Sequence, residues 1–172
     1  MIFRSLVIFL LLGAVCRADD NLFNYSNRTQ EALVVKVVAP DLIVLEDGRR
    51  VKLIGIESLG TPPPPPVKYD AKGRVIELPQ PPTIPLQEQA YVFARHLMEN
   101  KKVKLEYDVD PGDTNGYTNA YVYLPDGRMA NAVLLRMGFV KLSIVVPNVK
   151  YEGKLRAAYR QARQEKRGVQ DE

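Results

Sequence analysis

The residue types that most often carry enzyme chemistry are scarce in this chain. Its 172 residues include one cysteine, Cys16, and one histidine, His96. A zinc site of the usual kind draws on several such ligands, so the sequence excludes one. The chain also lacks a phosphate-binding glycine loop and a nucleophile motif. Any reaction at this protein would therefore rely on its carboxylates, its lysines and arginines, and its tyrosines.

Two stretches combine such residues with a strand-like pattern. Residues 51–60 read VKLIGIESLG, and residues 115–123 read NGYTNAYVY. Both resemble the staphylococcal-nuclease (thermonuclease-like) family, in which the first reads roughly R-L-I-G-I-D-x-P-E and the second D-x-Y-G-R-x-L-A-Y-V-Y. Residues 126–131 (DGRMAN) and 134–139 (LLRMGF) resemble the D-G-x-x-V-N…L-x-x-G-x-A segment of that family. Together these pieces extend the resemblance over residues 33–169.

The resemblance implies a calcium ion held by two carboxylates and one backbone carbonyl. The first carboxylate falls at Asp41, and the second at Glu57, which is one methylene longer than the aspartate of the family. Ser58 would supply the carbonyl. Calcium takes about six to eight oxygen ligands, so water would have to complete the shell. The alternatives are that Asp41 is a plain turn residue and Glu57 an exposed acid at a strand end.

The other roles that the resemblance implies fall on altered residues. The glutamate that positions or deprotonates the attacking water falls at Gly60, which has no side chain. The two arginines that grip the phosphate fall at Lys52, which keeps the charge but loses the fork geometry, and at Tyr117, which is uncharged. Losing one electrostatic stabiliser typically lowers the rate by about 10²–10³, and losing the general base by about 10²–10⁴. We therefore expect a catalytically impaired domain.

Replacement groups could come from elsewhere in the chain. Glu77 and Glu88 could supply an acid, and Arg74 and Arg95 could supply a cation. Under this alternative the protein is an active calcium-dependent phosphodiesterase, a nuclease with a rearranged site. One geometric criterion distinguishes the active phosphodiesterase from the catalytically impaired domain. Activity is favoured if either glutamate lies beside the two candidate calcium ligands with an arginine opposite.

An impaired domain of this family could still act by binding. OB-type barrels present a strand face on which aromatic side chains stack the bases of single-stranded nucleic acid. Tyr117, Tyr121 and Tyr123 are the candidates for this role, and we expect at most part of the set to share one groove, with Tyr121 or Tyr123 packed in the barrel. A protein partner is the other option, and a proline-rich insert at residues 61–85 could dock it.

The apolar pattern predicts the elements that must position these groups. β-branched runs and turn signals predict strands, and helical spacing of apolar residues, which begins after Pro85, predicts amphipathic helices. The predicted strands are residues 33–38, 42–45, 50–56, 103–107 and 120–124, and the predicted helices are residues 86–100, 129–137 and 151–166. This order predicts an α+β fold, a five-stranded OB-fold-like β-barrel with about three packed helices.

A proline-rich insert separates the third predicted strand from the first predicted helix. The chain holds 13 prolines, and five of them are consecutive at residues 62–66, which favours an extended polyproline conformation. Residues 67–78 could form a small hairpin that turns at residues 71–73. We expect a stiff surface excursion without a core of its own.

The N-terminus is typical of a secretory signal peptide. Arg4 precedes an unbroken apolar run at residues 6–12, and small residues would place the cleavage after Ala18. The run is short for a membrane span. A retained anchor and a lipid-modified Cys16 are the alternatives. We expect an exported protein, whether secreted, periplasmic or extracellular. Its predicted parts are a signal peptide at 1–18, a loose leader at 19–32, the thermonuclease-like domain at 33–169 and a tail at 170–172.

The net charge permits a nucleic-acid partner without requiring one. The full chain carries +4, and removing Arg4 and Arg17 with the signal peptide leaves +4 − 2 = +2. Cations gather near the C-terminus, where we favour a solvated helix face over a basic binding surface. These cations are Lys150, Lys154, Arg156, Arg160, Arg163, Lys166 and Arg167.

Overall fold

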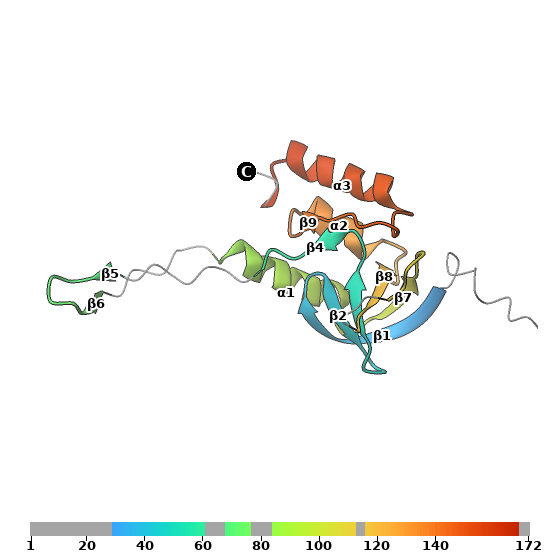
Figure 1. Ribbon diagram of the computed structural model, residues 1–172, viewed down its shortest axis with the longest axis horizontal. Coiled ribbons are helices and arrows are strands. Elements are labelled where there is room, and N and C mark those ends of the chain that lie inside the picture. Colours follow the sequence, from blue (N-terminus) through green and yellow to red (C-terminus); the bar gives the residue numbers. More distant parts are fainter. Residues whose placement is uncertain (1–28, 61–67, 77–83, 113–115, 169–172) are drawn as a thin grey trace, which may run out of the picture.

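A closed five-stranded barrel forms the centre of the computed structural model (Figure 1). Its strands follow one another in the order β1-β2-β3-β8-β7. All neighbouring pairs are antiparallel except β3 with β8, which is parallel. The strands are β1 (Thr29–Ala39), β2 (Leu42–Leu45), β3 (Arg50–Leu53), β7 (Lys102–Glu106) and β8 (Thr118–Tyr123). With three helices packed around it, this barrel confirms the predicted α+β, OB-fold-like class.

The structure describes residues 29–60, 68–76, 84–112 and 116–168. The predicted signal peptide, most of the predicted leader, the two proline runs of the insert and the predicted tail lie outside these ranges. No helix within them is both long enough and apolar enough to cross a membrane.

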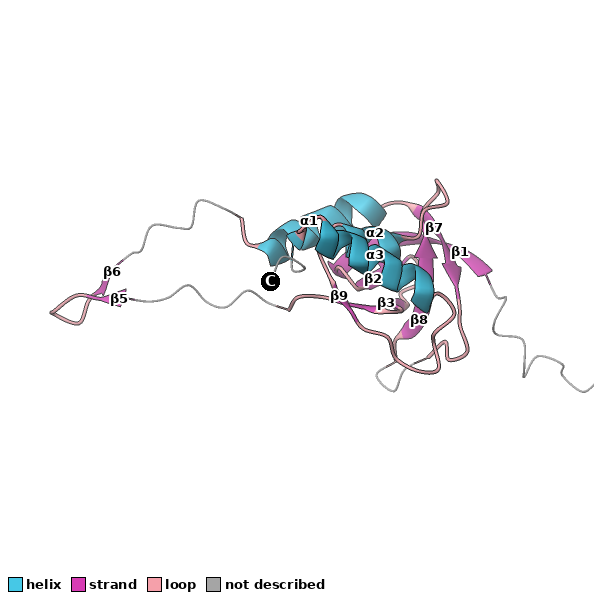
Figure 2. Ribbon diagram, turned by 90° about the horizontal axis from the view of Figure 1, so that it is seen from above, coloured by secondary structure: helices cyan, strands magenta, loops and turns pink. Residues whose placement is uncertain are grey.

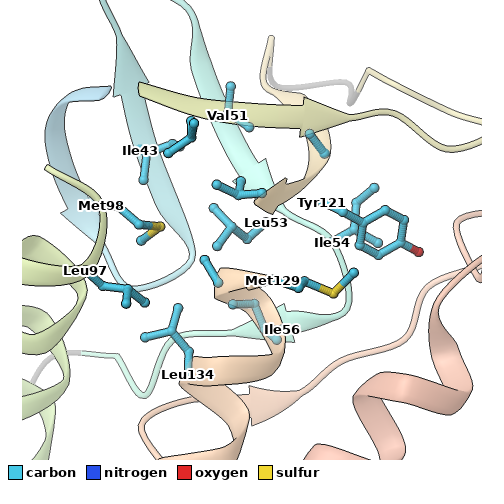
Figure 3. Close-up of a cluster of buried hydrophobic side chains, with 14 of the residues drawn as sticks. Ile43, Val51, Leu53, Ile54, Ile56, Leu97, Met98, Tyr121, Met129 and Leu134 are labelled. Atoms are coloured by element: carbon cyan, nitrogen blue, oxygen red, sulfur yellow. The ribbon is translucent and has the colours of Figure 1, made fainter. Parts of the chain in front are cut away.

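Alternating side chains fill the barrel. In β3, Val51 and Leu53 are buried, whereas the residues before and after Val51 are exposed. Period-two alternation places every second side chain on the inner face. Figure 3 shows these two side chains in one cluster with Ile43 of β2 and with Leu97 and Leu134 from the helices. Burying each such aliphatic side chain contributes about 1.5–3 kcal/mol, so this core is what holds the barrel closed.

Three helices cover one side of the barrel (Figure 2). They are α1 (Leu86–Met98), α2 (Ala130–Arg136) and α3 (Glu152–Gln164), each within two residues of its predicted bounds. The first packs on β1 and the second on β8, whereas α3 packs mainly on α2 and lies farther from the barrel (Figure 1). The buried face of α3 consists of Leu155, Ala158 and Ala162. The helical spacing in the sequence therefore predicted all three helices.

The third strand is shorter than predicted. It ends at Leu53, and after Ile54 and Gly55 the chain enters β4 (Ile56–Glu57), which leaves the barrel to pair with β9 (Lys141–Leu142). Gly55 has a φ of 80°, and a Cβ at this position would collide with Leu155 Cδ1. The glycine therefore allows the backbone to turn and α3 to approach it closely.

The first strand is longer than predicted. It begins at Thr29, so residues 29–32 of the predicted leader belong to the barrel. These residues pair with residues 103–106 of β7. The first three are exposed, so backbone hydrogen bonds rather than an apolar pattern extend the strand, and these residues show no period-two alternation that would predict it.

The insert contains the predicted hairpin. Its strands are β5 (Lys68–Tyr69) and β6 (Val75–Ile76). The Asp70 carboxylate accepts hydrogen bonds from the backbone N–H groups of Lys72 and Arg74 at 2.8 and 2.9 Å and closes the turn. Tyr69 is 65% exposed.

Candidate functional site

A cavity of about 620 Å³ opens where β3 leaves the barrel. We call it the strand-end cavity. Its walls come from the β3–β4 turn, from β8 and from two loops, which contribute residues 110–112 and 143–148. It is lined by Lys52, Leu53, Ile54, Gly55, Ile56, Glu57, Asp110, Gly112, Asn119, Ser143, Val145, Val146, Pro147 and Asn148.

Hydrogen bonds fix the two loops against each other. The backbone N–H of Asp110 donates to Asn148 Oδ1 at 2.9 Å, and Asn148 Nδ2 donates back to the Asp110 carbonyl at 2.8 Å. Nearby, the buried Asp108 carboxylate accepts hydrogen bonds from the Tyr121 hydroxyl at 3.0 Å and from the Lys150 backbone N–H at 2.9 Å. The rim of the strand-end cavity is therefore held in place before any ligand binds.

A buried asparagine fixes the floor of the cavity. Asn131 is fully buried at the start of α2. Its Nδ2 donates to the Ile54 carbonyl at 2.8 Å, and its Oδ1 accepts from the Val122 backbone N–H at 3.0 Å. These bonds join the β3–β4 turn to β8. Residue 131 belongs to the DGRMAN segment that supports the family resemblance, so the structure supplies the physical reason for an asparagine there.

Lys52 and Glu57 share the strand-end cavity. Both are exposed, and no salt bridge of either occurs within the described ranges. Lys52 lies in register with Leu42 on one side and Asn119 on the other. Asp110 adds a second acid to the lining. The cavity therefore offers one cation, two carboxylates and several amide groups to a polar ligand.

Asp41 lies at the start of β2, beside the end of β3. Its backbone carbonyl accepts a hydrogen bond from the Leu53 N–H at 2.9 Å. The residue is only 6% exposed, yet no hydrogen bond to its carboxylate occurs in the described part of the chain. Every fully buried polar side-chain atom there has a partner, so the Asp41 oxygens must reach solvent through the remaining opening. An acid with open oxygens and no donor is a suitable ligand for a cation.

The calcium ligands that the resemblance implies are only partly gathered. Glu57 lines the strand-end cavity, whereas Asp41 does not, and Ser58 lines a separate hollow. Within the described ranges no three acidic or histidine side chains are grouped closely enough to hold a metal ion. Two carboxylates and one carbonyl supply fewer oxygens than calcium prefers, so these residues fit a weakly held ion at most.

The separate hollow, of about 490 Å³, surrounds Gly60. Gly60 has a φ of 76°, and a Cβ built there would meet no atom within 4 Å. Glu88, in the first turn of α1, lines the same hollow. The full lining is Val38, Ala39, Pro40, Ser58, Leu59, Gly60, Gln87, Glu88, Ala90 and Tyr91. One candidate replacement acid, Glu88, therefore lines the same hollow as Gly60.

The candidate replacement arginines are engaged elsewhere. Arg95 forms a salt bridge with Glu99 at 3.1 Å, and Arg74 forms one with Asp70 at 2.9 Å. No arginine lines the hollow around Gly60 in the part of the chain that the structure describes. Glu77 lies outside that part. The hollow that Glu88 lines includes neither Asp41 nor Glu57, so in the described part of the chain neither the acid nor the cation of the geometric criterion is in place.

The three candidate stacking tyrosines differ in accessibility. Tyr121 is fully buried, its hydroxyl donates to Asp108, and its ring lies edge-on to Tyr151 at 4.8 Å. Burial raises the pKa of Tyr121, and no ring face is open to a base. Tyr123 is half-buried, with Lys154 Nζ 5.8 Å from the centroid of its ring. Tyr117 is half-buried just before β8 begins.

The sequence did not identify three polar residues of the strand-end cavity. Asn119 lies inside the NGYTNAYVY stretch, so its place on the barrel could have been read from strand alternation. Asp110 and Asn148 have no such signal. They are 38 residues apart, and only the fold brings them together.

The barrel, its three helices and the strand-end cavity define an OB-fold-like α+β domain with a polar site at the end of one strand. A family model described as "Staphylococcal nuclease homologue" matches residues 50–170. The chain is 32% identical to the thermonuclease of Staphylococcus intermedius over 145 residues, which cover 83% of this chain and 77% of that protein. It is 31% identical to the thermonuclease of Staphylococcus hyicus over 139 residues, 79% of this chain and 73% of that protein. The chain belongs to the staphylococcal nuclease homologue family.

Proposed function

We propose that this chain is an exported thermonuclease-like domain that binds single-stranded nucleic acid but hydrolyses it poorly. The observation that carries the proposal is Gly60. The glutamate that positions the attacking water in the family falls at this residue, which has no side chain. An attacking water needs a positioned base, and the developing charge on the phosphate needs fixed cations. Tyr117 removes one of those cations, and Lys52 replaces another without its fork.

Binding a nucleic acid requires fewer positioned groups than hydrolysing it. A phosphodiester backbone is attracted by any accessible cation and is held by amide donors. Lys52 provides the cation in the strand-end cavity, and Asn119 and Asn148 line the same walls. Because these groups are fixed by the barrel and by the paired loops, a ligand would order few side chains on binding.

The calcium ion that the resemblance implies belongs to this proposal. Asp41, Glu57 and the Ser58 carbonyl would hold it, and it would supply positive charge next to a bound phosphate. The same residues favour millimolar rather than micromolar affinity. Export through the predicted signal peptide would bring the domain to compartments where calcium at that concentration is available.

A graft of the missing groups tests the proposal. Restoring them with Gly60→Glu and Tyr117→Arg should produce calcium-dependent cleavage of single-stranded DNA where the native chain shows little. The left-handed backbone at residue 60 adds strain of about 1–2 kcal/mol, but the space for the side chain is open. Gly48→Glu with Tyr117→Arg is the matched control, because Gly48 has a φ of 83° and equally open surroundings. Equal activity of the native chain and the graft would contradict the proposal.

A second candidate function is slow hydrolysis with Glu88 as the replacement base. It is favoured by one observation, the presence of Glu88 in the hollow around Gly60. Under this alternative the native chain cleaves single-stranded DNA, and Glu88→Gln abolishes the cleavage. Glu46→Gln, at an exposed turn, is the control. The lack of an arginine in the described lining of that hollow is the reason we rank this function second.

A further inference from the structure

Two cations lie side by side on the outer face of β3. Val51 and Leu53 point into the barrel and are 0% and 1% exposed. Arg50 and Lys52 alternate with them and are both exposed. Residues two apart on a strand share a face and are separated by about 6.6 Å along it. The two cations therefore form a short row that leads to the strand-end cavity, which Lys52 lines.

The neighbouring strands surround this row with uncharged groups. Leu42 of β2 lies opposite Lys52, and Val44 lies opposite Arg50. On the other side, Val51 lies in register with Thr118 and Lys52 with Asn119. Tyr117 directly precedes Thr118, the first residue of β8 to pair with β3. The positions across the two strands from these cations thus include no acid that would neutralise them.

Arg50 differs in this respect from the adjacent arginine. Arg49 is held by Asp47, with 2.6 Å between Nε and Oδ2, and its Nη1 donates to the Tyr107 hydroxyl at 3.2 Å. Within the described ranges Arg50 forms no salt bridge and no side-chain hydrogen bond. Its five guanidinium donors are therefore available to a phosphate, which they can bind in a bidentate manner.

We propose that Arg50 is a phosphate-binding residue and that Arg50 and Lys52 bind neighbouring phosphates of a single-stranded nucleic acid along β3. Leu42, Val44 and Tyr117 would then face the bases, as apolar and aromatic groups do on other OB-type faces. The arginine that is absent at residue 117 is thus replaced from the adjacent strand. This inference rests on the proposed nucleic-acid binding. It identifies the outer face of β3 as the surface along which the nucleic acid reaches the strand-end cavity.

Salt dependence of binding tests this role. A labelled oligothymidylate is titrated with the full chain in the presence of chelator, at several salt concentrations, by fluorescence anisotropy. Each phosphate contact with a single strand contributes about 0.7 to the slope of log K against log salt. Arg50→Gln should lower the slope by about 0.7 and, since 0.1 M salt is one decade below 1 M, weaken binding about fivefold at 0.1 M. Lys52→Gln should do the same.

Two further variants distinguish a specific phosphate contact by Arg50 from electrostatic attraction that depends on net charge alone. Arg160→Gln, in the middle of α3, is the matched control, because Arg160 is also exposed and forms no salt bridge in the described part of the chain. It should leave the slope unchanged. Adding Tyr117→Arg to Arg50→Gln should restore the slope, since Arg50 begins β3 and Tyr117 directly precedes β8, the strand that pairs with β3 in parallel. A purely structural role of Arg50 would not be rescued in this way.

The outcomes discriminate between the two proposals. If the native chain does not bind the oligonucleotide, both proposals fail. If the native chain binds and Lys52→Gln lowers the slope but Arg50→Gln does not, the proposed function stands and the role of Arg50 is overturned. An equal loss in Arg50→Gln and Arg160→Gln also overturns it, because binding would then follow net charge alone. Thermal unfolding of each variant verifies that the barrel is intact.

Discussion

At Gly60 the backbone is open to solvent and carries no side chain, although the strands around it keep the geometry of the family. At Tyr117 and Lys52, too, the fold is kept while the residue type differs from the arginine of the family. A side chain at a strand end or loop contributes little to the core, so it can change while the barrel persists. Under the proposed function, the individual residues therefore decide whether a phosphate is only bound or also hydrolysed.

Calcium should stabilise the native chain modestly and through Asp41. With a dissociation constant near 1 mM, 10 mM calcium raises the free energy of unfolding by about 1.4 kcal/mol. Asp41→Asn should remove this increase, because the amide offers one weaker oxygen ligand in place of a carboxylate. Thermal melts of both proteins, with calcium and with chelator, measure the effect. Glu46→Gln serves as the control. Equal stabilisation of native protein and Asp41→Asn would place any calcium elsewhere.

Glu106 should make stability depend on pH. Burial opposes its ionisation, but the Lys150 ammonium at 2.7 Å and the Tyr151 hydroxyl at 2.9 Å hold its pKa below the usual 4.5. A lowered folded pKa gives stability that is present above about pH 4.5 and is lost as pH falls through the folded value.

A glutamine variant measures this contribution. Glu106→Gln should lower the free energy of unfolding by about 1.5–3 kcal/mol at pH 7, and the difference from the native chain should shrink below pH 4.5. Urea unfolding at pH 7 and pH 3.5 is the measurement. Glu31→Gln, an exposed acid on β1, should show no comparable change. A difference that is the same at both pH values would contradict the assignment.

At the level of elements, the turn between β3 and β4 gives the site its shape. Strand alternation and helical spacing predicted the barrel strands and all three helices, because their buried faces repeat along the chain. The β4–β9 pair and the Asp110–Asn148 contact could not be predicted in this way. Each joins residues far apart in sequence through a few hydrogen bonds, and two-residue strands have no periodic pattern. The wall of the strand-end cavity is therefore the part of the structure that the sequence did not predict.

Removing the Asn131 amide should destabilise this turn strongly. Asn131→Ala leaves the Ile54 carbonyl and the Val122 N–H without their partner in a buried setting, which should cost about 2–4 kcal/mol. Asn119→Ala is the matched control. Asn119 is half-buried, and its Nδ2 donates to Gly112 at 3.2 Å, so its loss should cost about 1 kcal/mol or less. Urea unfolding compares the two variants, and equal losses would show that the buried bonds have no special weight.

At the scale of the whole molecule, a closed barrel keeps its geometry while the residues at its end vary. The core brings together residues from the barrel strands and all three helices. Figure 3 shows part of it, with Leu97 of α1 and Leu134 of α2 beside the strand residues. The charged residues of the site lie outside this core. The family resemblance of the sequence follows from this core, from the turn residue Gly55 and from the buried Asn131 of α2. The fold was accordingly predictable from the sequence, whereas the parallel register of Lys52 with Asn119 and the place of Glu88 required the three-dimensional structure.

Cleavage of single-stranded DNA by the purified chain is the most direct test of impaired hydrolysis with retained binding. The native chain and Asp41→Ala are incubated with the DNA in calcium and in chelator, while binding is followed in parallel. We predict that the native chain binds the DNA and that its cleavage in calcium does not exceed that of Asp41→Ala. Calcium-dependent cleavage by the native chain that disappears in Asp41→Ala would contradict it.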